Sequence, residues 1–154
     1  MIEPPRILQT AAQTVACIHI TVPRSEIRKV MGPGLAELKQ ELRSQGIVPT
    51  GPWLTHHLRM DPAIFDYELC LPVAGPVKAA GRVKTSELPA TTAAYTLYSG
   101  PYEELASGWS EFEAWIAARG HRSAPSLWET YLVDPSVTPD PAAWRTGLTR
   151  PLLD

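Results

Sequence analysis

The sequence has little cysteine, no long hydrophobic run and no excess of charge of either sign. Its two cysteines, Cys17 and Cys70, stand in no CxxC or Cys/His spacing, so a disulfide framework or a metal site is not expected. No stretch approaches the roughly 18 apolar residues of a membrane helix, and residues 1–5 lack the build of a signal peptide. The 14 basic and 16 acidic residues argue against a surface that reads nucleic-acid phosphates. We therefore expect a cytoplasmic protein without direct contacts to nucleic acid or membrane.

The composition is that of an ordinary globular protein with many aromatic rings. Of the 154 residues, 44% are hydrophobic and 19% are charged, which predicts a single folded domain over residues 1–154. The 16 prolines fall between patterned segments and punctuate the fold. Five tryptophans and five tyrosines suit either a core or an apolar pocket.

Four landmarks recur in the same order along the chain, which indicates an internal repeat. They are Thr14 with Thr91, Gly46 with Gly120, Asp61-Pro62 with Asp134-Pro135, and Leu71-Pro72 with Arg150-Pro151, at offsets of 77, 74, 73 and 79. We interpret them as two halves, over about residues 6–75 and 80–152, each with the order strand, helix, strand, strand. The alternative is coincidence among common dipeptides.

The first half predicts strands at residues 7–22, 52–60 and 65–73, from their apolar and β-branched content. A helix is expected to begin after Ser25 as N-cap and to end at Gly46, with a kink or a restart at Pro33. A further strand at residues 82–87 either lies between the halves or extends the first sheet.

The second half predicts strands at residues 91–99, 127–133 and 146–152, with a helix between Gly100-Pro101 and Gly120. The whole is an α+β fold with antiparallel sheets and two long helices. The offset of 77 aligns Ile18 with Tyr95, which would direct Tyr95 toward the helix. Tyr98 would then lie on the opposite face, with His19 as its approximate counterpart in the first half, so Tyr98 is a better candidate for a pocket than Tyr95.

Glu129 is the leading candidate for a functional residue, because its carboxylate lies in a strand otherwise suited to burial. Leu127, Glu129 and Tyr131 share one face by the period of two. A carboxylate among aromatic rings attracts a lipophilic cation, and burial would also make it a usable general acid or base. The alternative is a solvated residue on an open strand face.

His56 is a weaker catalytic candidate. Counting back five residues from each Asp-Pro sets His56 against Glu129 in the repeat, where it could face Glu129 across a groove. The alternative is a surface or hydrogen-bonded histidine. His56-His57 is not expected to bind a metal, because neighbours on a strand point to opposite faces. No cofactor is expected.

Several short motifs together resemble a known family. They are Gln13-Thr14-Val15-Ala16, Ser99-Gly100-Pro101-Tyr102, Glu129-x-Tyr131-x-x-Asp134-Pro135, and the closing residues 146–152. Over about residues 6–152 the chain resembles the GyrI-like small-molecule-binding domain, which also serves as the effector domain of AraC-type and multidrug-sensing regulators. The resemblance implies duplicated βαββ modules with a ligand groove at a pseudo-two-fold junction.

The resemblance assigns roles to particular residues. Glu129 maps onto the family's central acidic residue, and Tyr131 and Tyr102 match its tyrosines. Some stand-alone members resemble hydrolases that open strained cyclopropane-bearing compounds. No helix-turn-helix is expected before the repeat, which puts direct transcriptional control in doubt.

The sequence therefore leads to three functional hypotheses. The first is a binding protein for hydrophobic, cationic or planar small molecules, with Glu129 as the charge. Its expected ligand-binding residues are Tyr98, Tyr102, Tyr131, Trp53, Trp128, His19 and His56. The second is a hydrolase of strained electrophiles that uses Glu129 as acid or base, assisted by His56 or a tyrosine. The third is a protein-interaction role with a separate regulatory partner, or as a homodimer.

Overall fold

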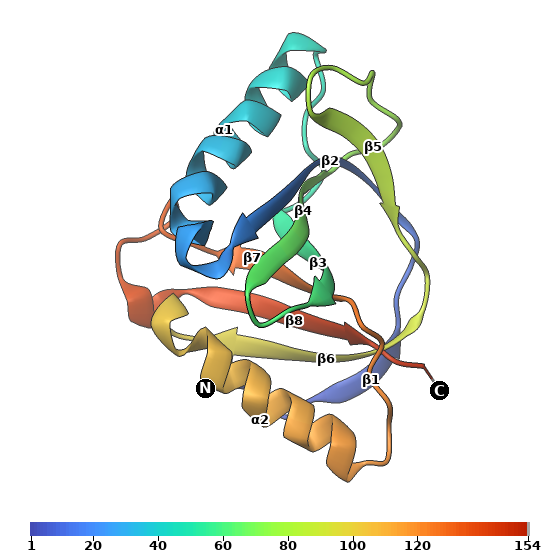
Figure 1. Ribbon diagram of the computed structural model, residues 1–154, viewed down its shortest axis with the longest axis vertical. Coiled ribbons are helices and arrows are strands. Elements are labelled where there is room, and N and C mark those ends of the chain that lie inside the picture. The colour runs from blue at the N-terminus through green and yellow to red at the C-terminus, as the bar shows by residue number, and fades with distance from the viewer. Residues whose placement is uncertain (154) are drawn as a thin grey trace. The chain divides into compact units, whose positions relative to one another are not determined.

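The computed structural model describes residues 1–153, and the chain divides into two compact units. The first unit comprises residues 11–90, and the second comprises residues 1–10 together with the chain from Thr91 onward. In each unit a long helix accompanies antiparallel strands (Figure 1). The fold is therefore α+β, as predicted. No helix within residues 1–153 is both long enough and apolar enough to cross a membrane.

The first unit is a four-stranded sheet with one long helix. It contains β2 (Gln13–Pro23), α1 (Ile27–Ser44), β3 (Leu54–Met60), β4 (Ile64–Pro72) and β5 (Val83–Leu88). The strand order is β3-β4-β2-β5, and each of these pairings is antiparallel. Because β5 pairs with β2, the strand expected near residues 82–87 extends the first sheet.

The core of the first unit lies between α1 and one face of this sheet. Ile18 and Ile20 of β2 are buried together with Leu38 and Leu42 of α1, which confirms the predicted helix-facing side of this strand. The helix approaches the sheet closely at Gly34, where an added Cβ would lie 3.0 Å from a methyl carbon of Leu69.

Two expectations about the first helix are wrong. Ser25 is not the N-cap, because residues 24–26 form a 3₁₀ turn and α1 begins at Ile27. Of the kink or restart expected at Pro33, the restart does not occur, since α1 continues through this proline. Burial of Leu38 and Leu42 offsets the hydrogen bond that proline cannot donate. The left-handed stop at Gly46 is confirmed, with φ of 70°.

The second unit is also a four-stranded sheet with a helix. It contains β1 (Arg6–Gln9), β6 (Thr92–Ser99), α2 (Leu105–Ala118), β7 (Leu127–Val133) and β8 (Arg145–Pro151). The strand order is β1-β6-β8-β7. The single strand expected at residues 7–22 is therefore wrong: its beginning is β1, which pairs with β6, and its end is β2. Spacing within the segment carries no information about a partner that lies so far along the chain.

The two units share the order strand, helix, strand, strand, but their register differs from the predicted one. Val15 lies opposite Pro72, and Ala93 lies opposite Pro151, so β2 and β6 correspond at an offset of 78 and not 77. A slip of one residue exchanges the two faces of a strand. Tyr98 is accordingly buried with Phe112 of α2, and its predicted place on the face away from the helix is wrong.

Candidate ligand-binding site

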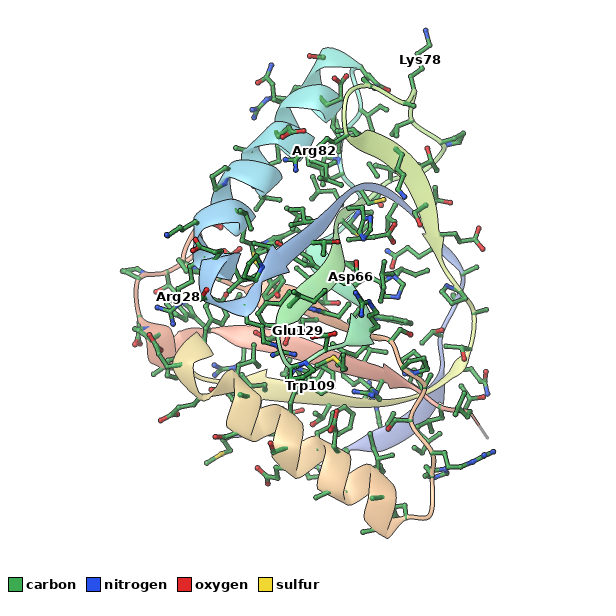
Figure 2. All side chains as sticks on the ribbon, in the orientation of Figure 1. Arg28, Asp66, Lys78, Arg82, Trp109 and Glu129 are labelled. Carbon is green, nitrogen blue, oxygen red and sulfur yellow. The ribbon has the colours of Figure 1, made fainter. Side chains whose placement is uncertain are left out.

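The carboxylate of Glu129 is held by two aromatic side chains of the second unit. Glu129 lies in the middle of β7, opposite Leu148 of β8, and is half-buried. It accepts a hydrogen bond of 2.6 Å from the indole Nε1 of Trp109 on α2 (Figure 2 labels both residues). It accepts a second hydrogen bond, of 2.8 Å, from the hydroxyl of Tyr131. The bond to Tyr131 confirms that positions 129 and 131 share one strand face.

Both partners of this carboxylate are neutral donors. Hydrogen bonds from an N–H and an O–H fix the orientation of the two carboxylate oxygens. Within residues 1–153, no lysine, arginine or histidine forms an ion pair with Glu129. The negative charge is therefore fixed in place but not cancelled, which leaves it available to a cationic ligand.

Two further rings adjoin this pair. The ring of Tyr102 meets that of Tyr131 edge to face, at 6.0 Å between centroids, and stacks on Trp144 at 4.8 Å. Tyr102 directly follows Gly100-Pro101. Gly100 has a φ of 129°, a conformation that is strained for residues other than glycine. We call Trp109, Tyr131, Tyr102 and Trp144 the aromatic cluster.

The hydroxyl of Tyr102 is a polar group without a partner. Its oxygen is buried and makes no hydrogen bond within the described part of the chain. Burial raises the pKa of Tyr102 to about 12, with smaller contributions from the charges of Asp134 and Glu129. At neutral pH the group is therefore a neutral O–H, able to donate to a ligand. An unpaired buried donor is costly, so a bound acceptor would relieve that cost.

Two aromatic residues predicted to line the site do not point toward Glu129. Tyr98 is fully buried, and its hydroxyl donates to the carbonyl of Pro101 at 2.6 Å. Tyr98 is a core residue beneath α2, because the observed offset of 78 between β2 and β6 places its side chain on the helix-facing side of β6. Trp128 neighbours Glu129 in β7, so alternation directs it to the other face of the strand.

The remaining predicted residues, Trp53, His19 and His56, belong to the first unit. Trp53 packs against the core beneath α1. Nε2 of His19 lies 2.5 Å from a carboxylate oxygen of Asp66. Nδ1 of His56 lies 3.5 Å from the buried carboxylate of Glu68.

The predicted correspondence of His56 with Glu129 is wrong. Leu54 lies opposite Cys70, and Trp128 lies opposite Thr149, which sets Thr55 and not His56 in the place of Glu129. Both strands have a register shift at the matching point, after His57 and after Tyr131. The first half then has one residue more before its Asp-Pro, so counting back from that pair selects the wrong neighbour.

Trp109 and Trp144 are the two site residues that sequence reasoning did not assign to the site. Trp109 belongs to the apolar stripe of α2, a pattern that indicates a core residue. It does pack against the core, and its N–H is nevertheless directed to Glu129. Trp144 lies in the segment after Asp134, where no periodic pattern marks it. For Trp109 the available signal was its indole N–H, which requires an acceptor when it is buried. The indole N–H of Trp144 gives no such signal, because it donates to the carbonyl of Thr138.

The model of the GyrI-like small molecule binding domain matches residues 3–148. Comparison with curated protein sequences gives no match.

Solved structures share the fold at low sequence identity. The crystal structure of the EcmrR C-terminal domain is 22% identical, with a TM-score of 0.84, and the match covers 97% of this chain and 96% of that one. In the EcmrR–DNA complex the match covers 57% of the EcmrR chain, so this chain spans little more than half of that regulator.

Two more distant structures carry different descriptions. SAV2435 bound to tetraphenylphosphonium is 11% identical with a TM-score of 0.62, and the match covers 97% of this chain and 94% of that one. A hydrolase from Listeria innocua is 15% identical with a TM-score of 0.66, and the match covers 96% and 91%. The family match over nearly the whole sequence, supported by the shared fold, shows that this chain belongs to the GyrI-like small-molecule-binding domain family.

Proposed function

We propose that this protein binds hydrophobic cations, or planar drug-like molecules that carry positive charge, at the aromatic cluster around Glu129. The observation that carries the proposal is the carboxylate of Glu129, oriented by Trp109 and Tyr131 and not neutralised by a cation. Ring faces and the carboxylate attract the same cation together, and the attraction grows as water is excluded. The tetraphenylphosphonium complex of SAV2435 supports a ligand of this class in the family.

A ligand without N–H groups suits this site well. The oxygens of Glu129 already accept hydrogen bonds from Trp109 and Tyr131. A quaternary cation makes no hydrogen bonds, so it can gain from the charge without breaking these contacts. We therefore expect charge and ring contact, more than hydrogen bonding, to select the ligand.

Quenching of tryptophan fluorescence tests the proposal, because Trp109 and Trp144 belong to the site. We expect tetraphenylphosphonium to quench, and tetraphenylborate, an anion of nearly the same shape, to bind at least about tenfold more weakly. Glu129→Gln keeps the size and the acceptor oxygen but removes the charge, and should weaken tetraphenylphosphonium binding by a similar factor. Glu103→Gln changes an exposed carboxylate of the same unit and is the matched control. Equal binding of both ions would refute the proposal.

A second candidate function is hydrolysis of a strained electrophile, favoured by the unpartnered hydroxyl of Tyr102. Glu129 would take a proton from water that attacks an epoxide or cyclopropane carbon, while the Tyr102 hydroxyl protonates the leaving oxygen or carbonyl. The neighbour from Listeria innocua that is described as a hydrolase is consistent with such chemistry in this fold. His56 is not part of this proposal, because its partner is Glu68.

Product analysis distinguishes the two functions. Epoxides and cyclopropyl ketones are incubated with the protein and searched for the hydrated product by mass spectrometry. For an enzyme, Glu129→Gln should lower turnover by about 10²–10⁴-fold, and Tyr102→Phe should lower it as well. A binding protein would give no product while retaining affinity for the cation.

We also propose that the protein acts in the cytoplasm. It would act there alone, as a homodimer, or together with a regulatory protein partner.

A further inference from the structure

A cleft in the first unit, which the proposed function does not use, lies between α1 and β2. Its volume is about 410 Å³, within the range of small-ligand sites. Four consecutive residues of β2, from 19 to 22, line it together with Lys29, Pro33 and Gly34 of α1 and with Arg82. Because side chains alternate along a strand, four successive lining residues mean that the cleft follows the edge of β2 and not one face.

This edge of β2 has no neighbouring strand at its end. β2 pairs with β4 as far as Pro23, whereas its pairing with β5 ends at Ile18. The carbonyl of Thr14 accepts a hydrogen bond from Val73, just after β4, and the amide of Arg24 donates one to Ala63, just before β4. The even-numbered residues of β2 therefore direct their backbone N–H and C=O groups toward β4. In an antiparallel strand the odd-numbered residues then face the side of β5. The N–H and C=O of Thr21 therefore lie on the uncovered edge.

The cleft is lined by cations and by no acidic residue. Its charged or titratable residues are His19, Lys29 and Arg82. Their carboxylate partners, Asp66, Glu26 and Glu37, are outside the lining. Arg82 donates to Glu37 through Nε and Nη2, and its Nη1 makes no hydrogen bond within the described part of the chain. The cleft thus presents donors and positive charge next to an open strand edge.

We propose that this cleft binds a short acidic peptide segment in extended conformation. The peptide adds as a strand beside Thr21 and places a carboxylate against Lys29 and Arg82 (Figure 2 labels Arg82). An open strand edge supplies backbone hydrogen bonds to such a peptide, and flanking side chains select its sequence.

The test is fluorescence anisotropy with a fluorescein-labelled acetyl-Glu-Val-Glu-Val-Glu amide at low ionic strength. The acidic peptide should bind, and the matched Lys-Val-Lys-Val-Lys peptide should not. Combining Lys29→Glu with Arg82→Glu should weaken the acidic peptide at least about fivefold and make the basic peptide the better ligand. This exchange of preference would not follow from simple loss of folding. Equal binding of both peptides, or no binding of the acidic one, would overturn the proposal.

Strand pairing is tested separately from charge. Thr21→Pro removes the amide donor and should weaken binding about fivefold, whereas Thr21→Val loses the same side-chain bond to Asp66 but keeps the amide and should bind normally. N-methylation of one alternate set of peptide residues should abolish binding, while methylation of the other set is tolerated. If glutarate competes as well as the peptide, strand addition is wrong. Glu129→Gln should leave peptide binding unchanged, since Glu129 does not line this cleft.

Discussion

The buried carboxylate of Glu68 in the first unit has a strongly lowered pKa. Its oxygens lie 3.5 Å from Nδ1 of His56 and 3.5 Å from Nζ of Lys84, and its side chain is 9% exposed. The adjacent imidazole of His56 and the charge of Lys84 outweigh burial and lower the pKa of Glu68 from 4.5 to about 2. Glu68 is therefore an anion at all ordinary pH values.

This shift has a defined sign for stability. Because the pKa of Glu68 is lower in the folded state, its stabilising contribution is present above about pH 4.5 and is lost as the pH falls toward about 2. Glu68→Gln should lower the free energy of unfolding by on the order of 2 kcal/mol at neutral pH, and by much less near pH 2. Urea unfolding at several pH values measures the difference. Glu87→Gln, on the exposed side of β5, is the control, and a difference independent of pH would contradict this account.

Two glycines in helices should respond oppositely to alanine. At Gly108 of α2 an added Cβ would lie 2.7 Å from Cδ1 of Tyr98, a buried ring fixed by its bond to Pro101. At Gly32 of α1 an added Cβ would have no atom within 4 Å apart from its chain neighbours and the backbone of the helix. We expect Gly108→Ala to destabilise by about 1–3 kcal/mol, and Gly32→Ala to stabilise by up to about 1 kcal/mol. Thermal unfolding of both variants measures this, and a stabilising Gly108→Ala would show that the ring moves freely.

At the scale of elements, α1 carries a proline in its interior. Pro33 removes one helical hydrogen bond but is exposed, so alanine fits without repacking. We expect Pro33→Ala to raise the free energy of unfolding by about 1–2 kcal/mol, less than the full helix penalty because proline also restricts the unfolded chain. Denaturant titration would detect the change. An unchanged midpoint would mean that the local backbone already compensates for the missing bond.

The elements were predictable where a local pattern specifies them. Apolar spacing and the glycines at positions 46 and 120 located the C-terminal ends of both helices, since these signals act within a few residues. The register of β6 was not predictable, because no local sequence signal distinguishes an offset of 77 from an offset of 78 between β2 and β6. The pairing across the sheet decided it, and the side of Tyr98 followed. Splitting residues 7–22 into two strands likewise depended on the distant partner β6.

The candidate site was predictable to the same degree. The period of two placed Glu129 and Tyr131 on one face, and their hydrogen bond agrees. Contacts of Glu129 with Trp109, and of Tyr102 with Trp144, join segments that are far apart in the sequence. Such contacts depend on how α2 and the segment before β8 pack, and no spacing rule encodes that packing.

At the scale of the whole molecule, the first ten residues belong to the unit formed by the end of the chain. β1 pairs with β6, the amide of Ser99 donates to the carbonyl of Met1, and the Thr96 hydroxyl donates to the carbonyl of Glu3. Deleting residues 1–9 should therefore destabilise the second unit and expose an edge of β6. Hydrogen exchange should become faster in β6 and stay unchanged in β2, whereas uniform acceleration in both strands would contradict this.

The pairing of β1 with β6 also constrains how the protein is made. Ile7 leaves the ribosome well before its partner Ala94, which is synthesised 87 residues later. The first unit, residues 11–90, is complete by then and can fold during translation. The opening segment must therefore stay unpaired throughout that interval, and closing this long loop is the slow contribution to folding that its topology imposes.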